Sequence, residues 1–372
     1  MAVSTSHSPV PLDEYPIHQT PLSMARVGTS DRNFYDRSYF NAHDRDGGTL
    51  LITGMGVYPN LGVTDAYAIV RRGDILRSVR FSDALEQRDL DLRVGGYRVE
   101  ILEPLQRIRL ICEHDDLGFD LTWEGSFPAI NEEPHTILTG SRPIIDAQRF
   151  AQVGSWAGTL HVDGVDITVD PAVWMGTRDR SWGIRPVGEA DPPGRAAAEG
   201  SGGFWWLYVP LRFDEFSIVV ILQENPDGFR TLNDAVRIWR DGRVEQLGWP
   251  RAHFEYRSGS RHPIAARLDL TTSDGKPLEI EIRPHTFIPL HIGAGYGGDP
   301  DWQHGRWMGR DWSSSVRYDL SDPEVAARIP WGVIDHVGQA RCGDAEGWGL
   351  FEHATMGRHD PTGFADWSSV AP

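Results

Sequence analysis

Positive charge is scarce in this chain of 372 residues, and lysine is almost absent. The 36 Lys and Arg residues are outnumbered by 53 Asp and Glu, which gives a net charge of −17, and Lys276 is the only lysine. Nucleic acids and anionic membranes are bound through clustered Lys and Arg that neutralise phosphates. The charge balance therefore argues against both classes of partner.

Long apolar runs and paired cysteines are also missing. The chain has no run of about 18 or more apolar residues, so we expect no membrane-spanning helix. Residues 1–30 are polar and contain no basic segment followed by an apolar one, so we expect no secretory signal. Cys112 and Cys342 have no metal-binding or redox spacing. We therefore expect a cytoplasmic protein, with the pairing of the two cysteines left open.

Glycine and proline, by contrast, are abundant and divide the chain into short segments. The 40 Gly and 25 Pro separate runs that alternate in polarity or are rich in β-branched and aromatic residues, which is typical of strands. Turn sequences such as Asp241-Gly242 predict hairpins between them. We expect an antiparallel sandwich or barrel. Strands are expected over residues 49–54, 66–70, 97–102, 107–112, 119–123, 159–169, 204–211, 216–222, 235–239, 267–270, 278–282 and 348–353, and short helices over 82–92 and 322–329.

Two pairs of segments indicate an internal repeat. Residues 36–39 read Asp-Arg-Ser-Tyr and residues 179–182 read Asp-Arg-Ser-Trp. Residues 65–73 and 234–242 share the pattern Asp-Ala-x-x-Ile-x-Arg-x-Gly, a strand that runs into a turn. Two matches in the same order favour a duplicated β unit.

The repeat predicts a domain division near residue 175. We expect an N-terminal arm (1–30), a first β domain (31–175) and a second β domain (176–372). The second domain carries an acidic loop insertion at 188–203, rich in Gly, Pro and Ala, which accounts for most of its extra length.

Several short motifs resemble one known family. Residues 176–183 read Gly-Thr-Arg-Asp-Arg-Ser-Trp-Gly and follow a strand that carries Val-Asp-Gly at 162–164. Residues 103–107 (Glu-Pro-Leu-Gln-Arg) and 347–353 (Gly-Trp-Gly-Leu-Phe-Glu-His) add to the pattern. Together they resemble the AttH/CrtC group, the hydroxyneurosporene synthase-like proteins. The resemblance implies two packed lipocalin-like β-barrel domains, and enzymes that hydrate, isomerise or cyclise polyene, terpenoid or prenylated substrates without a redox cofactor.

The charged motif at 178–182 has two interpretations. Strand alternation places Asp179 and Ser181 on one face and Arg178, Arg180 and Trp182 on the other. In a structural role, Trp182 closes one end of a barrel, an arginine stacks on it, and Asp179 pairs with the other arginine. In a functional role, Asp179 faces a ligand cavity as a catalytic acid.

The C-terminal hairpin supplies further candidates. Asp335-His336 lies on one arm and Glu352-His353 on the other. Two carboxylates and two imidazoles on neighbouring strands can form an acid/base pair. The alternative is cross-strand charge pairing on a solvated face. Glu352 follows an apolar run, so we take Glu352 and His353 as catalytic candidates beside Asp179.

Aromatic residues are the candidates for substrate contact. The chain has 14 Trp, and indole faces suit a flat apolar ligand, a sugar ring or a developing carbocation. Core packing is the alternative for most of them. The predicted substrate-binding residues are Trp205, Trp206, Tyr208, Trp302, His304 and Trp307.

A metal site is not expected. His285 and His291 share a face of one predicted strand, with His304 as the nearest further ligand, but hydrogen-bonded structural histidines explain them better. Glycine-rich phosphate loops, Gly-x-Ser-x-Gly elbows and Cys-x-x-Cys pairs are also absent from the sequence.

These residues and the resemblance support three hypotheses. The first is a cofactor-independent hydratase, isomerase or cyclase that protonates a hydrophobic unsaturated small molecule through a carboxylic acid of raised pKa. The second is a lipocalin-like protein that binds apolar small molecules without chemistry. The third is a carbohydrate-active protein, which requires two carboxylates facing a groove. The sequence leaves the oligomeric state open.

Overall fold

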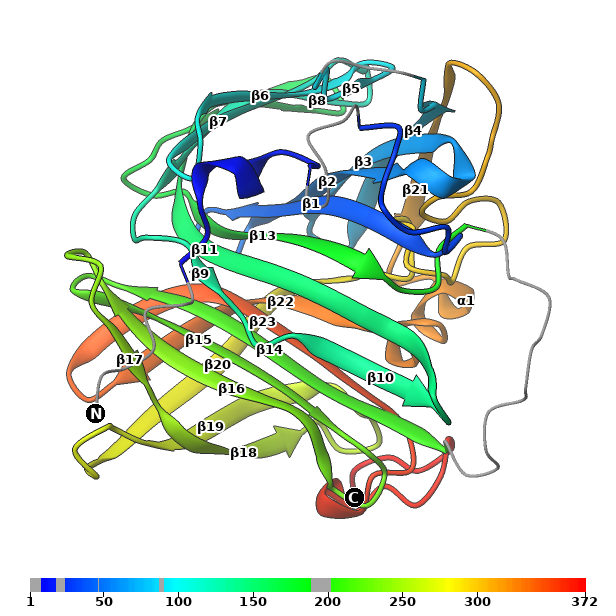
Figure 1. Cartoon of the computed structure of the whole chain (residues 1–372). Coiled ribbons are helices and arrows are strands. Elements are labelled where there is room, and N and C mark those ends of the chain that lie inside the picture. Colours follow the sequence, from blue (N-terminus) through cyan, green and yellow to red (C-terminus); the bar gives the residue numbers. More distant parts are fainter. Residues whose placement is uncertain (1–7, 18–23, 46, 87–89, 189–201) are drawn as a thin grey trace.

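Antiparallel β-sheet dominates the molecule (Figure 1). The computed structural model describes residues 8–17, 24–45, 47–86, 90–188 and 202–372. Its strands form two sheets of 14 and nine strands, and the paired strands run antiparallel. The expectation of an all-β chain is confirmed.

Most of the 14-stranded sheet occupies the upper half of Figure 1, and β10 extends into the lower half. Its main path is β21-β4-β3-β2-β1-β13-β11-β8-β7-β6-β5, and β9, β10 and β12 pair with β11 outside this path. The strands are β1 (Phe34–His43), β2 (Thr49–Tyr58), β3 (Val63–Arg72), β4 (Ile75–Ala84), β5 (Arg93–Val94), β6 (Tyr97–Glu103), β7 (Arg107–Cys112), β8 (Leu117–Gly125), β9 (Ile130–Asn131), β10 (His135–Thr139), β11 (Arg142–Val162), β12 (Val165–Val169), β13 (Met175–Ile184) and β21 (Trp312–Asp319).

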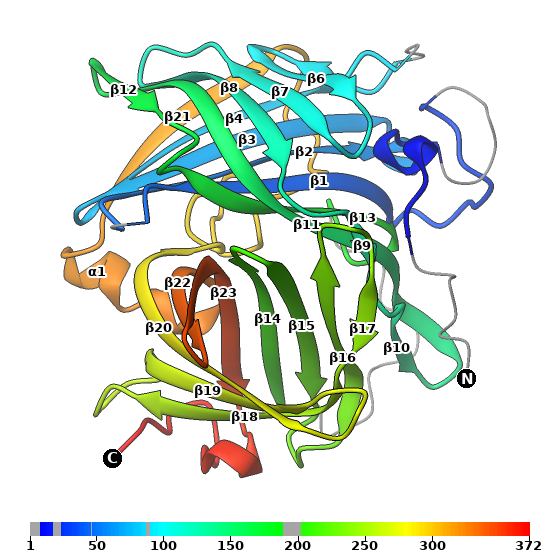
Figure 2. The ribbon, with the colours of Figure 1, turned by 90° about the vertical axis from the view of Figure 1, so that its left-hand side faces the viewer.

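The nine-stranded sheet lies below it and curls around its own core (Figures 1 and 2). Its strand order is β17-β16-β15-β14-β23-β22-β20-β19-β18. The strands are β14 (Gly203–Phe213), β15 (Phe216–Glu224), β16 (Arg230–Trp239), β17 (Val244–Gln246), β18 (Gly248–Tyr256), β19 (Pro263–Thr271), β20 (Pro277–Pro289), β22 (Ile334–Cys342) and β23 (Ala345–Gly357).

The expected strands lie within observed ones, with one refinement. The segment 159–169 is a hairpin of β11 and β12 rather than a single strand. Asp163 and Gly164 form its turn, and both have positive φ (48° and 81°). An Asp-Gly pair adopts this left-handed backbone more readily than other residues, which explains the tight reversal.

Helices are few and short. They are η1 (Pro11–Glu14), η2 (Pro59–Leu61), α1 (Pro323–Ala326), η3 (Ile329–Trp331) and η4 (Asp360–Thr362). The helix expected over 322–329 is present as α1, and the Asp322 carboxylate accepts a hydrogen bond from the backbone N–H of Glu324 at 2.8 Å. None of the helices in the described ranges is long and apolar enough to cross a membrane.

The helix expected over 82–92 is wrong. Strand β4 continues through Ala84, where Ser82 pairs with Asp65 of β3 and Trp312 of β21. Ladder hydrogen bonds to two neighbouring strands outweigh the weak helical pattern of the segment. Residues 87–89 of this segment lie outside the described residues.

The two copies of the Asp-Arg-Ser-aromatic motif lie side by side. Strand β1 carries the first copy and pairs with β13, which carries the second; Asp36 stands opposite Trp182, and Tyr39 opposite Asp179. All of β13 except Met175, and all of β21, lie beyond residue 175 in sequence but belong to the 14-stranded sheet. The domain division at 175 itself stays a prediction. Of the expected loop at 188–203, residues 189–201 lie outside the described residues.

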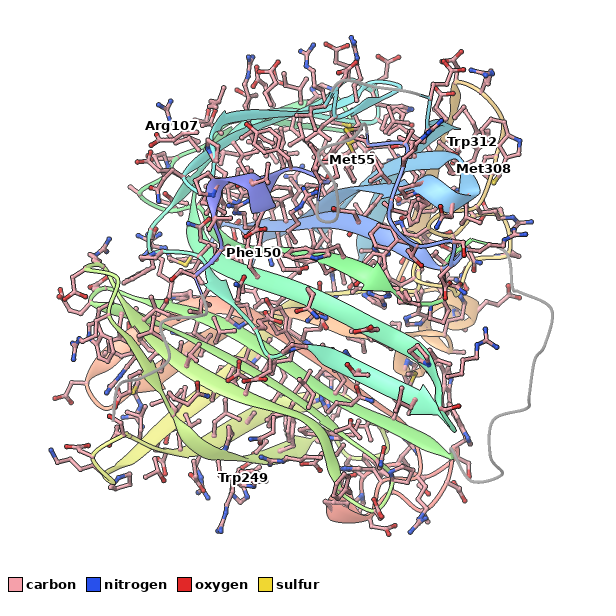
Figure 3. The ribbon with its side chains drawn as sticks, viewed as in Figure 1. Met55, Arg107, Phe150, Trp249, Met308 and Trp312 are labelled. Carbon is pink, nitrogen blue, oxygen red and sulfur yellow. The ribbon has the colours of Figure 1, made fainter. Side chains whose placement is uncertain are left out.

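Apolar side chains form three main clusters, one inside each sheet and one between the sheets. Consecutive residues of β14 divide between them: Trp205 and Leu207 enter the core of the nine-stranded sheet, whereas Trp206 and Tyr208 enter the middle cluster. Strands near the junction are therefore buried on both faces. Figure 3 shows Phe150 of β11 in this central region, whereas Trp249 of β18 points outward and is 67% exposed.

Cys112 and Cys342 are both free thiols. Cys112 is buried, and its Sγ contacts the carbonyl oxygen of Leu117 at 3.5 Å.

Candidate functional site

A cavity of about 130 Å³ lies between the two sheets. Strands β1, β11 and β13 of the 14-stranded sheet line one side, and β14 and β23 of the nine-stranded sheet line the other. Residues of the connection between β20 and β21, including Tyr296 and His304, complete the wall. The cavity is therefore a product of the packing between the sheets, and both sheets contribute acidic and aromatic side chains to it.

Strand alternation in β13 separates the structural residues from the cavity residues. Asp179 and Ser181 line the cavity. On the opposite face, Arg178 pairs with Glu14 at 2.7 Å and Arg180 pairs with Asp36 at 2.5 Å. The arginines of the motif thus have carboxylate partners elsewhere, and Asp179 is left facing the cavity.

The environment of Asp179 favours its protonated form. Burial raises the pKa of Asp179 to about 6, against the opposing effect of the Arg149 guanidinium. Arg149 is itself paired with Glu132 at 3.3 Å. Burial raises the pKa of Glu132 to about 7, again opposed by Arg149. Low solvent access penalises the ionised carboxylates more than the single guanidinium compensates.

A second acidic pair comes from the C-terminal hairpin. Asp335 of β22 and Glu352 of β23 are direct cross-strand neighbours. The Tyr39 hydroxyl donates to Oδ2 of Asp335, and the Trp206 indole N–H donates to Oε1 of Glu352. Glu352 lines the cavity, and Asp335 lies behind it, fully buried.

These two carboxyl groups cannot both ionise easily. Burial and the neighbouring Glu352 carboxyl raise the pKa of Asp335 well above its usual range. Burial also raises the pKa of Glu352, whereas hydrogen bonds from Asp335 and Trp206 lower it. Asp335 therefore holds a proton near neutral pH, and like charges on adjacent buried groups are avoided.

Aromatic rings surround the acidic groups. Trp206 stacks on Phe204 (centroids 6.2 Å apart) and on His135 (5.6 Å). The Arg149 guanidinium lies 5.6 Å from the ring centroids of both Trp206 and Tyr208. The site thus combines proton donors with aromatic faces that can stabilise positive charge.

The sequence-predicted residues divide into two groups. Asp179, Glu352, Trp206, Tyr208 and His304 all line the cavity.

The other predicted residues lie elsewhere. His353 and Trp205 point to the opposite faces of β23 and β14, where their rings are 5.6 Å apart. Burial lowers the pKa of His353 to about 3. Trp302 is fully buried behind His304, and Trp307 is half exposed on the surface.

Several cavity residues are not among the predicted site residues. Arg37, Arg149, Arg185, Tyr35 and Tyr296 line the cavity, together with Tyr39 and Tyr67. Alternation along residues 35–39 was an available signal, because it places Tyr35, Arg37 and Tyr39 on one face.

A metal centre does not form from the described residues. Among them, no group of three or more His, Cys, Asp or Glu side chains is arranged to hold a metal ion. His285 contacts Gln339 at 3.1 Å, and His291 contacts the carbonyl oxygen of Arg328 at 2.8 Å. Both histidines are hydrogen-bonded structural groups.

The sequence profile of a family of unknown function, DUF8625, matches residues 10–365. The chain belongs to DUF8625. No curated protein sequence matches this DUF8625 member.

Solved structures identify the fold of this DUF8625 member. A protein assigned as AttH from Nitrosomonas europaea is similar over 86% of this chain and 92% of its own, with 12% identity and a TM-score of 0.53. CghA is similar over 87% of this chain and 88% of its own, with 12% identity and a TM-score of 0.50. Kievitone hydratase from Nectria haematococca is similar over 95% of this chain and 99% of its own, with 15% identity and a TM-score of 0.49. The AttH and CghA structures confirm the all-β lipocalin-like fold, and the first of them confirms the resemblance to AttH.

Proposed function

We propose that this protein is a cofactor-independent hydratase, isomerase or cyclase that acts by general acid catalysis on a hydrophobic unsaturated small molecule. The substrate class is terpenoid, polyene or prenylated, as the AttH/CrtC resemblance implies. The reaction takes place in the cavity between the two sheets.

One observation carries the proposal: Asp179 and Glu352 line the same buried, aromatic-walled cavity from opposite sheets. A carboxylic acid with a pKa near 6, as at Asp179, is protonated in a useful fraction of molecules near neutral pH. A weakly basic carbon–carbon double bond needs such an acid placed close to it and shielded from water.

The proposed chemistry begins with proton transfer from the Asp179 carboxyl group to one alkene carbon. The electron pair of the double bond forms the new C–H bond and leaves a carbocation. The faces of Trp206 and Tyr208 would stabilise this cation.

Capture of the cation determines the product. Attack by water, with its proton passing to the Glu352 carboxylate, gives an alcohol. Attack by a second double bond or hydroxyl group of the substrate forms a ring, and the resulting cation then loses a proton to the Glu352 carboxylate. Direct loss of a proton next to the first cation, again to Glu352, gives an isomer. Asp335 acts as a positioning residue, because it is the protonated cross-strand neighbour of Glu352, and the Trp206 N–H holds the Glu352 carboxyl group in place.

Non-catalytic binding of an apolar ligand is the alternative, since the same cavity would hold such a ligand unchanged. The carbohydrate hypothesis is weaker. It needs carboxylates facing a groove that admits a sugar and water, whereas the acidic groups here lie in a small aromatic cavity.

Turnover in D2O tests the proposal. Wild-type protein is incubated with prenylated phenols, linear terpenoids and polyenes, and products are analysed by mass spectrometry for solvent-derived deuterium on carbon and for added water. Because each variant removes a proton-transferring group, we expect Asp179→Asn and Glu352→Gln to reduce product formation by roughly 10²–10⁴-fold.

The matched control is Asp344→Asn, an exposed carboxylate in the turn between β22 and β23, which should leave turnover unchanged. Wild-type rates in both Asp179→Asn and Glu352→Gln would refute the assignment. A tightly retained ligand recovered chemically unaltered, with no product from any compound, would favour the binding protein.

A further inference from the structure

Among the described residues, two arginines at the outer edge of the cavity lack carboxylate partners. Arg37 of β1 is 8% exposed, and Arg185 follows the end of β13. Within the described residues, neither guanidinium has a carboxylate oxygen within the 4.0 Å of an ion pair. Acidic side chains that could pair with them are plentiful, because the chain has a net charge of −17. Two neighbouring guanidinium groups without a carboxylate partner destabilise the folded state when little water reaches them.

Aromatic rings hold both guanidiniums in place. Arg37 lies 5.2 Å from the ring centroid of Tyr35 and 5.1 Å from that of Tyr296. Arg185 lies 5.5 Å from the same Tyr35 ring. Stacking occupies the flat faces of a guanidinium and leaves its N–H edges available, which is the arrangement that suits a carboxylate or phosphate.

Unpartnered polar atoms surround the two arginines. The Tyr35 hydroxyl and Nε2 of His304 are buried and make no hydrogen bond to any described residue. Tyr35 is 0% and His304 is 4% exposed, and both side chains line the cavity. Buried polar groups are normally satisfied, so these two atoms indicate missing ligand atoms.

The arginines stand between the inner cavity and an outer pocket of about 470 Å³. Arg37, Arg185, Tyr296 and His304 line both spaces. Arg142, which is exposed, lines only the outer one. A ligand whose apolar part reaches Asp179 and Trp206 would therefore place its other end at Arg37 and Arg185.

We propose that Arg37 and Arg185, with Tyr35, bind an anionic group of the substrate, a carboxylate or a phosphate. This inference rests on the proposed function and narrows its substrate class to unsaturated hydrocarbons with an acidic head. The anion would also act on the catalytic acid. Both guanidiniums lower the pKa of Asp179, so an anion that neutralises them favours the protonated carboxyl group.

Binding of matched probes tests the proposal. Farnesoate and farnesyl phosphate carry the two anionic heads, and farnesol is their neutral counterpart. Affinities are measured by quenching of tryptophan fluorescence, with isothermal titration as a second readout. Charge-assisted hydrogen bonds predict that at least one anionic probe binds wild type about 10–100-fold more tightly than farnesol. The stronger of the two anionic probes identifies the head group.

Variants assign the preference to the two arginines. Arg37→Gln/Arg185→Gln should reduce the preference to less than about threefold while farnesol affinity stays close to wild type. Arg317→Gln, an exposed arginine on β21, is the control and should keep the preference. Equal affinity for farnesol and both anions, absence of binding by both anions, or a preference that survives in the double variant would each overturn the inference.

The outcome is separable from that of the proposed function. Asp179→Asn lacks the acid but retains both arginines, so it should lose turnover and keep the preference for anionic probes. A preserved preference with undiminished turnover in Asp179→Asn and Glu352→Gln would refute the catalytic assignment alone.

Discussion

At the scale of single residues, Asp179 shows how burial and neighbouring charge compete. The carboxyl group is partly buried, lines the cavity and lies in the field of Arg149, Arg37 and Arg185. Burial is the larger effect, because it raises the pKa to about 6 despite these cations. A buried carboxyl group with a raised pKa destabilises the folded state when it ionises, and such groups are common at functional sites.

This competition predicts a pH-dependent stability difference for Asp179→Asn. The folded pKa of about 6 exceeds the usual 3.8, so between these values the folded state holds a proton that the unfolded state has lost. Stability therefore falls as pH rises through this window, and the full cost remains above it. We compare the free energies of unfolding of the ligand-free variant and of wild type. From low pH to pH 8, this difference should shift in favour of the variant by roughly 1–3 kcal/mol.

Urea unfolding at about pH 4 and pH 8 measures this difference. Asp344→Asn should show no comparable change between the two pH values. If the stability of Asp179→Asn relative to wild type is the same at both pH values, burial does not disfavour the ionised form of Asp179.

At the scale of elements, the N-terminal arm is attached to β13 by a buried charge pair. Glu14 of η1 receives two hydrogen bonds from Arg178, at 2.7 and 2.9 Å, and one from the backbone N–H of Leu105 at 2.7 Å. Arg178 also donates to Gln152 of β11 at 2.8 Å. The pair connects the arm to the strand whose other face carries Asp179.

Removing one partner of this pair should be strongly destabilising. Glu14→Gln leaves the Arg178 charge buried without compensation, for which about 3–5 kcal/mol is typical. Glu14→Gln/Arg178→Met removes both charges and should recover part of the loss. The measurement is the free energy of unfolding in urea.

Glu86→Gln provides the control, because its pair with Arg310 is exposed (63% on both side chains). Exposed pairs contribute about 0–1 kcal/mol. If Glu14→Gln and Glu86→Gln lower the free energy of unfolding equally, the Glu14–Arg178 pair does not stabilise the attachment of the arm to β13.

At the scale of the whole molecule, the site depends on both sheets at once. Asp179 comes from the 14-stranded sheet and Glu352 from the nine-stranded sheet, and a continuous apolar cluster fills the junction around them. Strand β13 also pairs with β1 on one side and β11 on the other, so the first sheet needs residues beyond 175 to be continuous.

A fragment of residues 1–175 should therefore not fold on its own. It lacks all of β13 except Met175, so β1 and β11 lose a shared partner and the middle cluster is exposed to water. We expect no cooperative unfolding transition and strong binding of an apolar dye. Co-expression with residues 176–372 should restore a folded complex. A fragment 1–175 that unfolds cooperatively would instead support an independent domain that ends at residue 175.

Sequence by itself determined the local features of this protein. The periodicity of two predicted the strands, and it placed Asp179 and Ser181 on one face of β13, away from Arg178 and Arg180. The hairpin around Gly343 brought Asp335 opposite Glu352, because a short turn fixes the register of its two arms. These relations depend only on neighbouring residues.

Only the tertiary structure decided which of these faces meet. Arg37 and Arg185 are 148 positions apart in sequence and meet because β1 pairs with β13, with Phe34 opposite Ile184. Glu352 and Asp179 share a cavity because two sheets pack face to face. The helix expected over 82–92 failed for the same reason, since β3 and β21 pair with that segment. Long-range pairing and sheet packing depend on the free energy of the whole fold, which no local pattern encodes.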